Sequence, residues 1–205
     1  MRIIELVSNP GVGGLESVVE SLGRGLVSLG HDLKVLLFCD PVAPRPPLAA
    51  GLESAGVNVE IVFRPSRSYL RERRMAAELC ESYKPDVVHT HGYRADLLAE
   101  PVIRSMGIPT VGTVHGFAGG DFKNRIYEWL QLRAFRRFSA VIAVSRPLAE
   151  HMRSAGIPAE KLHLVLNGWR PASPPLSRLE ARAAWIYLLT ERGSDLSDGF
   201  PPRKA

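Results

Sequence analysis

Two histidines, His89 and His91, follow an apolar run and stand two residues apart. At that spacing along a β-strand, both side chains point to the same face of the sheet. Two imidazoles placed in this way could bind a metal ion, but no third ligand stands nearby in the sequence. We therefore predict no metal site. We expect a hydrogen-bonded structural role for His89 and a polar role in a cleft for His91.

A third histidine, His115, follows another apolar run, Thr110 to Val114, and precedes Gly116. An imidazole at the end of a buried strand can donate a hydrogen bond to a hydroxyl group or stabilise charge that develops in a reaction. The alternative is a structural histidine that only satisfies its neighbours. Because ligands of parallel sheets bind beyond the carboxyl ends of the strands, we predict a role in the site for His115.

A glycine-rich loop, residues 9–16 with the letters NPGVGGLE, separates the first apolar run from the first helical pattern. Glycines let backbone amides approach a ligand, and a helix N-terminus favours an anion, so a phosphate would fit there. The loop is not a Walker A motif, and it lacks the dinucleotide fingerprint because Glu16 stands at the third glycine position. Phosphate contact at Gly13 and Gly14 and a plain tight turn remain alternatives. Glu16 could simply favour the positive end of the helix dipole.

Ser145 stands between an apolar run, Ala140 to Val144, and a helical pattern that begins at Pro147. Serine is favoured at the N-cap of a helix, and proline is favoured in its first turn. The hydroxyl of Ser145 could therefore cap this helix or face the crevice. The next apolar run, residues 162–166, ends in an Asn-Gly dipeptide that favours a turn.

Short apolar runs alternate with helical patterns along the first 170 residues. The predicted strands are residues 2–7, 33–38, 57–63, 86–89, 110–114, 140–144 and 162–166, and the predicted helices are residues 15–29, 48–55, 69–83, 95–106, 122–138 and 147–155. Pro101 should bend the helix that contains it. The alternation and the continuous apolar runs predict an α/β fold, a Rossmann-like parallel sheet with helices on both faces. The ligand crevice should lie beyond the carboxyl ends of the strands.

The composition is that of an ordinary globular domain with a basic balance. The chain has 205 residues, 45% of them hydrophobic, and a formal net charge of +5, which tolerates anionic partners without selecting one. Its two cysteines form neither a zinc pattern nor a disulfide framework. No apolar run approaches the roughly 20 residues that span a bilayer, and no signal peptide is recognised, so we expect a cytoplasmic protein. Residues 171–205 have the composition of a linker or disordered tail.

The motifs and their order resemble the N-terminal, acceptor-side domain of GT4 glycosyltransferases, which have the two-domain GT-B fold. The matching segments are residues 13–16, 85–91, 113–116, 143–145 and 165–168, with the letters GGLE, PDVVHTH, TVHG, AVS and VLNG. The resemblance covers residues 1–170 and implies one Rossmann-like half of such an enzyme. It implies retaining transfer of a sugar from a nucleotide sugar to an acceptor hydroxyl on a glycan or lipid, without a metal or other cofactor.

The resemblance also implies roles for individual residues. The glycine loop of such enzymes lies near the donor diphosphate, which corresponds here to Gly13 and Gly14. The histidine after the fifth strand lies at the reaction centre, which corresponds to a catalytic role for His115. The other expected residues of the cleft are Glu16, His91, Tyr93 and Ser145, of which the region of His91 and Tyr93 would face the acceptor.

The chain departs from the family after Gly168. The family's second domain holds the donor phosphates with a basic pair and reads the nucleotide with a Glu-x7-Glu element, and residues 169–205 contain neither. Those residues are too few to form a domain of that size. We therefore expect a truncated or frameshifted end, and a chain that is inactive alone. A separate donor-domain chain could complete the enzyme.

The alternative function is a non-catalytic module that binds an acceptor or an anionic membrane surface. Basic amphipathic helices can lie on anionic lipid, so contact would be peripheral, at the inner membrane face. The residues that motivate it are Arg64, Arg67, Arg71, Arg73, Arg74, Arg133, Arg136 and Arg137, beside Trp129 and Phe135. A solvated helix face would have the same composition. The sequence contains no recognised nucleic-acid-binding module, so we predict no nucleic-acid partner.

Overall fold

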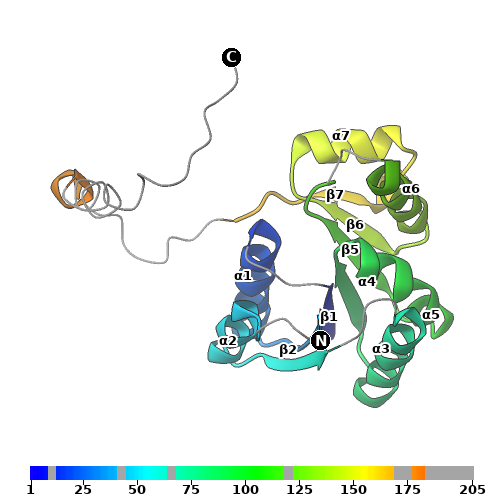
Figure 1. Ribbon diagram of the computed structural model, residues 1–205, viewed down its shortest axis with the longest axis horizontal. Helices are drawn as coiled ribbons and strands as arrows, with labels where there is room; N and C mark the ends of the chain where they lie inside the picture. Colours follow the sequence, from blue (N-terminus) through cyan, green and yellow to red (C-terminus); the bar gives the residue numbers. More distant parts are fainter. Residues whose placement is uncertain (9–12, 41–44, 64–67, 118–121, 169–176, 183–205) are drawn as a thin grey trace, which may run out of the picture. The chain divides into compact units, whose positions relative to one another are not determined.

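The computed structural model describes six segments of the chain, residues 1–8, 13–40, 45–63, 68–117, 122–168 and 177–182 (Figure 1). The chain divides into two units, Met1–Gly168 and Trp169–Ala205. In the second unit a short helix at residues 178–182 is described. The first four residues of the glycine loop, the arginines at 64 and 67, and the chain after residue 182 lie outside the described residues.

The first unit contains a single parallel sheet. Its strands are β1 (Arg2–Ser8), β2 (Asp32–Cys39), β3 (Asn58–Phe63), β4 (Val87–His91), β5 (Thr110–Val114), β6 (Ala140–Ala143) and β7 (Leu162–Leu164). Their order across the sheet is β3-β2-β1-β4-β5-β6-β7, and every neighbouring pair is parallel. The order reverses between β1 and β4, which makes the carboxyl ends of these two strands the topological switch point. The predicted Rossmann-like sheet is confirmed.

Helices lie on both faces of this sheet (Figure 1). They are α1 (Gly14–Ser28), α2 (Pro47–Ser54), α3 (Tyr69–Tyr83), α4 (Tyr93–Leu98), α5 (Glu100–Ser105), α6 (Phe122–Phe135) and α7 (Arg146–Ser154), with a short 3-10 turn at Ala159–Lys161. The helices α1 and α2 cover β1 to β3 on one face, and the later helices cover the other. On the α1 side a hollow of about 240 Å³ lies beside β4, β5 and β6. Among the described residues, none of the helices combines the length and the apolar character needed to cross a bilayer.

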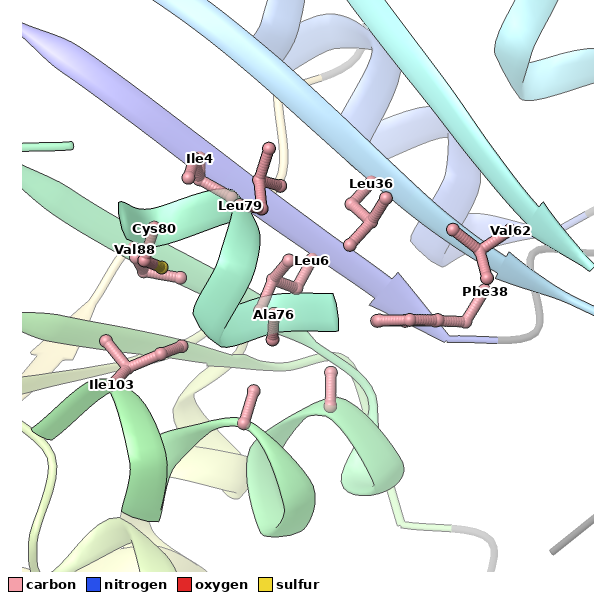
Figure 2. Close-up of a cluster of buried hydrophobic side chains, with 12 residues drawn as sticks. Ile4, Leu6, Leu36, Phe38, Val62, Ala76, Leu79, Cys80, Val88 and Ile103 are labelled. Carbon is pink, nitrogen blue, oxygen red and sulfur yellow. The ribbon is translucent and has the colours of Figure 1, made fainter. Parts of the chain in front are cut away.

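The strand β1 shows why the sheet is apolar at consecutive positions. Ile4 and Leu6 pack with α3, α4 and α5, as the close-up of this cluster shows (Figure 2), while Ile3 and Val7 pack with α1 and α2. A strand buried on both faces needs apolar side chains on both, so the period-two alternation disappears. The one charged residue in this run, Glu5, is also fully buried, and it is paired in register with His89 of β4.

Two predicted helices differ from the observed ones. The predicted helix 95–106 is two helices, α4 and α5, which meet at Ala99. Pro101 does not bend a continuous helix, because it lies in the first turn of α5, where its missing N–H is not needed. The helix α6 ends at Phe135 rather than Phe138, and Phe138 is buried in the core with it.

A glycine in β5 sets the distance between the sheet and α6. A Cβ atom on Gly112 would stand 2.7 Å from the Phe135 ring and 3.0 Å from the Phe138 ring. Only hydrogen fits at this position, so the two aromatic rings pack directly on the strand. This close approach places the first turns of α6 beside the carboxyl ends of the strands.

Candidate active site

A cleft of about 280 Å³ lies at the carboxyl edge of the sheet, where the sequence predicted it. Its walls come from the start of α1, the start of α4, the end of β5 and the inner side of α6. Residues that line it include Leu15, Tyr93, His115, Tyr127, Glu128 and Gln131. Segments more than a hundred residues apart in the chain therefore meet around His115.

His115 lines the cleft, and it comes directly after β5. Its Nε2 lies 3.1 Å from Nδ1 of His91, while its buried Nδ1 has no hydrogen-bond partner among the described residues. Burial lowers its pKa to about 4, although the charge of Glu16 raises it in part. The ring is therefore neutral at neutral pH, and it can donate or accept a hydrogen bond without carrying charge.

His91 does not face the cleft, and the expectation that it does is wrong. Its side chain is fully buried behind His115, with ring centroids 5.4 Å apart. The cause is the sheet register, which pairs His91 with Val7 on one side and Thr113 on the other, inside the α1 face. Burial first, and then the charges of His89 and His115, hold the pKa of His91 well below its usual range.

His89 has the structural role predicted for it. Its Nε2 lies 2.7 Å from Oγ1 of Thr113, and its ring lies beside that of His91, tilted by 43° with centroids 4.2 Å apart. The prediction that the two rings share one side of β4 is therefore confirmed. Burial lowers the pKa of His89 to about 3, so this ring is neutral too.

Glu5 is the third polar group of this cluster, which the sequence reading did not find. One carboxylate oxygen of Glu5 and one ring nitrogen each of His89 and His91 all lie within 4.8 Å of one another. Neither carboxylate oxygen has a hydrogen-bond partner among the described residues. Burial raises the pKa of Glu5 to about 8, so its carboxyl is mostly protonated at neutral pH. The signal in the sequence that could have indicated this cluster is a charged residue, Glu5, within an otherwise apolar strand.

The described part of the glycine loop leads into α1 at the edge of the cleft. Gly13 stands at the N-cap of α1 with extended backbone, and no side chain caps the helix there. A Cβ on Gly14 would meet no atom of the described residues within 4 Å. Leu15 lines the cleft, and the carboxylate of Glu16 is close enough to affect the pKa of His115. The loop and His115 are therefore brought together, as the phosphate interpretation requires.

Tyr93 lines the cleft from the start of α4 and forms part of an aromatic wall. Its ring stacks on that of Tyr127 of α6, with centroids 5.1 Å apart, and the amine of Lys123 lies 5.8 Å from the Tyr127 ring. Gly92 places Tyr93 there with a φ of +91°, a conformation that favours glycine. A flat, half-exposed aromatic face of this kind can stack against a sugar ring.

A buried acid holds the two walls of the cleft together. Asp96 of α4 accepts hydrogen bonds from the hydroxyl of Thr90, at 2.5 Å, and from the amide of Gln131 in α6, at 2.6 Å. Burial raises the pKa of Asp96 to about 7, and the two hydrogen bonds lower it in part. This network, which joins residues 35 positions apart, was not predicted.

Ser145 takes the capping role rather than the cleft role. Its side-chain oxygen accepts a hydrogen bond from the backbone N–H of Leu148 at 3.4 Å, at the N-terminus of α7. It is not among the described residues that line the cleft. Of the six other predicted site residues, Tyr93 lines the cleft with His115, and Glu16 is near enough to act on the pKa of His115. Gly13 and Gly14 directly precede Leu15, which lines the cleft, while His91 and Ser145 do not line it.

The chain was compared with known proteins. In sequence, it is 29% identical over 97 residues to the Escherichia coli UDP-Gal:alpha-D-GlcNAc-diphosphoundecaprenol alpha-1,3-galactosyltransferase, a match that covers 44% of this chain and 25% of that protein. In structure, it superposes on Anabaena HepE in complex with UDP with a TM-score of 0.69 at 20% identity, covering 94% of this chain and 50% of HepE. The lipopolysaccharide outer core galactosyltransferase WaaB gives a TM-score of 0.62 at 17% identity, covering 87% and 50%.

These likenesses agree on the fold and on the part of the fold that is present. The chain spans about half the length of the solved glycosyltransferases that it matches and a quarter of the Escherichia coli enzyme. The family model described as Glycosyltransferase Family 4 matches residues 12–172, which include residues 12–16 of the glycine loop and His115. The chain belongs to Glycosyltransferase Family 4.

Proposed function

We propose that this chain forms the acceptor-side half of an enzyme that transfers a sugar from a UDP-sugar to a hydroxyl of a glycan- or lipid-linked acceptor. The observation that carries the proposal is the position of His115, a neutral imidazole in the cleft between the start of α1 and the aromatic wall. UDP is favoured as the nucleotide because the Escherichia coli relative is named for UDP-Gal and the HepE structure contains UDP. Retention of the anomeric configuration is proposed from the GT4 resemblance.

Each wall of the cleft has its own part in this proposal. The uncapped N-terminus of α1 at Gly13 and Gly14 directs backbone N–H groups and the positive end of the helix dipole toward the donor diphosphate. His115, which lines the cleft, lies beside the donor sugar and helps to orient it toward the acceptor hydroxyl. The stacked rings of Tyr93 and Tyr127 hold a ring of the acceptor. No metal or other cofactor takes part.

The other half of the enzyme, which binds the nucleotide, would close over this cleft. Without it the chain has only part of the charge that stabilises the leaving diphosphate, so we expect no transfer by the chain alone. A second domain in the same protein or a separate chain would serve equally.

A transfer assay tests the proposal. The chain, completed with a donor-binding half expressed alongside it, is incubated with a panel of UDP-sugars and an acceptor that carries GlcNAc on a lipid diphosphate. We expect transfer that is lost in His115→Ala and kept in His163→Ala, a matched change at an exposed histidine of β7. Proton NMR of the product gives the anomeric configuration. No transfer from any donor, or equal activity of the two variants, would contradict the proposal.

A second role, contact with an anionic membrane, is favoured by one surface of α6. We propose that this helix rests on the headgroups through Phe122, Ile126 and Trp129, which are spaced as neighbours on one helix face and are 79%, 42% and 60% exposed. The exposed cations Lys123, Arg125 and Arg133 flank them. Exposed aromatic and basic side chains on one helix are the composition of an interfacial helix.

The surface differs from the one expected from the sequence. Phe135 is fully buried, the guanidinium of Arg137 pairs with Glu100, and Arg136 donates to the carbonyl of Ala155. Phe135 therefore faces the core, Arg137 faces α5 and Arg136 faces the end of α7. Of the residues near α6 that the sequence analysis named for membrane contact, only Trp129 and Arg133 lie on the exposed face proposed here.

Sedimentation with vesicles tests the membrane role. The chain should bind vesicles of phosphatidylglycerol at low salt and release them at high salt, because screening weakens the attraction of the cations. Changing Phe122, Ile126 and Trp129 together to serine should abolish binding, whereas Leu29→Ser, at a 73% exposed position after α1, should not. Equal binding of both variants would exclude this surface.

A further inference from the structure

The side-chain amide of Gln131 lies between a buried acid and the cleft. Gln131 belongs to α6, its side chain and backbone together are only 6% exposed, and it is one of the residues that line the cleft. Its Nε2 donates a hydrogen bond to Oδ2 of Asp96 at 2.6 Å, and Asp96 is fully buried. The nitrogen end of the amide is therefore held in the core.

The oxygen end of the same amide is open. Oε1 of Gln131 has no hydrogen-bond partner among the described residues. Buried side-chain atoms without a partner do occur in this region, but Oε1 is not one of them. An unpaired oxygen that is not buried borders open space, and the open space that Gln131 lines is the cleft. The part of Gln131 that a ligand in the cleft meets is thus a hydrogen-bond acceptor.

The chemistry of Asp96 determines which end of the amide faces it. An ionised carboxylate only accepts hydrogen bonds, so it requires the NH₂ group of Gln131. Burial raises the pKa of Asp96 to about 7, so the neutral carboxyl is populated as well. Its Oδ1 lies 2.5 Å from the hydroxyl of Thr90, which also reaches the carbonyl of Val111 at 3.4 Å. A proton on Oδ1 can therefore be donated to Thr90, and Oδ2 accepts from Gln131 in both states.

This oxygen lies beside the aromatic wall of the cleft. Gln131 and Tyr127 are four residues apart in α6, so they are neighbours on one face of the helix, and both line the cleft. The ring of Tyr127 stacks on that of Tyr93. A sugar ring that packs on these tyrosines carries its hydroxyl groups around its rim, where a polar group one helical turn away meets them.

We propose that Gln131 determines specificity in the cleft, because its Oε1 accepts a hydrogen bond from one hydroxyl of the acceptor sugar. Asp96 is a positioning residue, which holds the NH₂ group in the core and so turns the oxygen to the cleft. The inference rests on the proposed function, in which the acceptor ring packs on Tyr93 and Tyr127. An acceptor fixed in this way selects a hydroxyl and rejects a deoxy sugar, because the oxygen would be left unpaired.

The orientation of the amide can be measured without a ligand. Gln131 is the only glutamine in the sequence, so an isotope label on glutamine reports on this residue alone. In the full chain labelled with ¹³C and ¹⁵N at glutamine, one proton on Nε2 should exchange with water on the order of tenfold more slowly than in free glutamine, because Asp96 holds it. Exchange of both protons at the free rate would overturn the orientation.

Binding of acceptor analogues to the full chain tests the selection of a hydroxyl. The probes are GlcNAc on a short lipid diphosphate and its monodeoxy analogues, one for each free hydroxyl. One analogue should bind about tenfold more weakly than the parent, and it alone should leave the Cδ signal of Gln131 unshifted. Gln131→Met, which keeps the length and loses the amide, should bind the parent as weakly as that analogue and no longer distinguish the two. His163→Ala is the control and should distinguish them normally.

Asp96→Asn separates the positioning role from a merely structural one. Asparagine has nearly the same size, but its NH₂ group can donate to Oε1 of Gln131, which turns the NH₂ group of the glutamine to the cleft. The affinity ratio between the parent and the selected analogue should therefore fall. An unchanged ratio in a folded Asp96→Asn chain would contradict the positioning role, because loss of stability alone does not alter which hydroxyl is selected.

Two further outcomes concern the contact itself. Equal binding of the parent and all analogues by the unmodified chain, or binding of none of them, would overturn the contact even if the methionine variant failed to fold. Equal discrimination by a folded Gln131→Met chain would do so as well.

The proposed function can fail separately. Discrimination through Gln131 by a chain whose completed enzyme transfers no sugar would contradict the proposed function and leave the contact established. Transfer by the completed enzyme, together with equal binding of all the analogues, would keep the proposed function and contradict the contact.

Discussion

Nδ1 of His91 lies 3.1 Å from Nε2 of His115, so a single hydrogen bond joins a fully buried ring to a ring that lines the cleft. The two residues are the last of β4 and the first after β5, on neighbouring parallel strands. This relationship makes the interior of the sheet part of the candidate site.

Replacing His115 by alanine should lower kcat of the completed enzyme by about 100-fold or more, because a positioned donor contributes about that much. KM for the UDP-sugar should change little, because in the proposed function the nucleotide is held mainly by the other half. Initial rates over a range of donor concentrations measure both constants. A large rise in KM with unchanged kcat would instead make His115 a binding residue.

Glu5 should make the stability of the chain depend on pH. Its folded pKa, raised by burial to about 8, lies above the ordinary value of 4.5, so its contribution to stability is complete below about pH 4.5 and is lost as the pH rises through 8. Between pH 7 and 8 the unmodified chain should lose about 1 kcal/mol of unfolding free energy relative to Glu5→Gln. Urea unfolding at the two pH values measures the difference.

Other groups near Glu5 titrate differently. His89 and His91 from β4 and His115 after β5 have pKa values lowered by burial, and Glu16 of α1 acts on His115. Their lowered pKa values stabilise the chain as the pH rises toward 7, the opposite sign. Asp96→Asn serves as the control. Burial raises the pKa of Asp96 only to about 7, so the stability that its protonated carboxyl contributes is mostly lost by pH 7. Equal pH profiles for the unmodified chain and Glu5→Gln would show that Glu5 is ionised.

Gly14→Ala should separate ligand binding from folding. A methyl group there meets no atom of the described part of the chain within 4 Å, so the free energy of unfolding should stay within about 0.5 kcal/mol of the original. If the amide of Gly14 contacts the donor diphosphate, the methyl group should weaken UDP-sugar binding by the completed enzyme several-fold. Calorimetry measures the affinity. Gly25→Ala, an equally open position in the same helix, is the matched control and should bind normally.

Gly112→Ala should destabilise the domain by about 1–3 kcal/mol, the usual cost of overpacking a core. The added methyl group would stand 2.7 Å from the Phe135 ring, and neither that ring nor Phe138 has exposed space to move into. Thermal unfolding followed by circular dichroism checks this. An unchanged melting temperature would mean that α6 does not pack on β5 as described.

The sequence was sufficient for the fold class and for the position of His115. Parallel strands that are buried on both faces have continuous apolar sequences. Because the strands are parallel, the residue after each of them lies at the same edge of the sheet. For that reason the sequence alone predicts that His115, Tyr93 and the glycine loop share one crevice. The capping alternative for Ser145 was equally local, since it depends on residues three positions apart.

Contacts between strands and helices that are distant in the chain decided the rest. Whether His91 faces a cleft or the core depends on the register of β4 between β1 and β5, which no local pattern records. Glu5 lies beside His89 only because that register pairs them across 84 residues, and Gln131 reaches Asp96 only because Gly112 lets α6 approach the sheet. Burial and pairing of polar groups, and with them the protonation of Glu5 and the three histidines, are properties of the assembled core. A sequence determines which groups are available, and only packing determines how far each is removed from water.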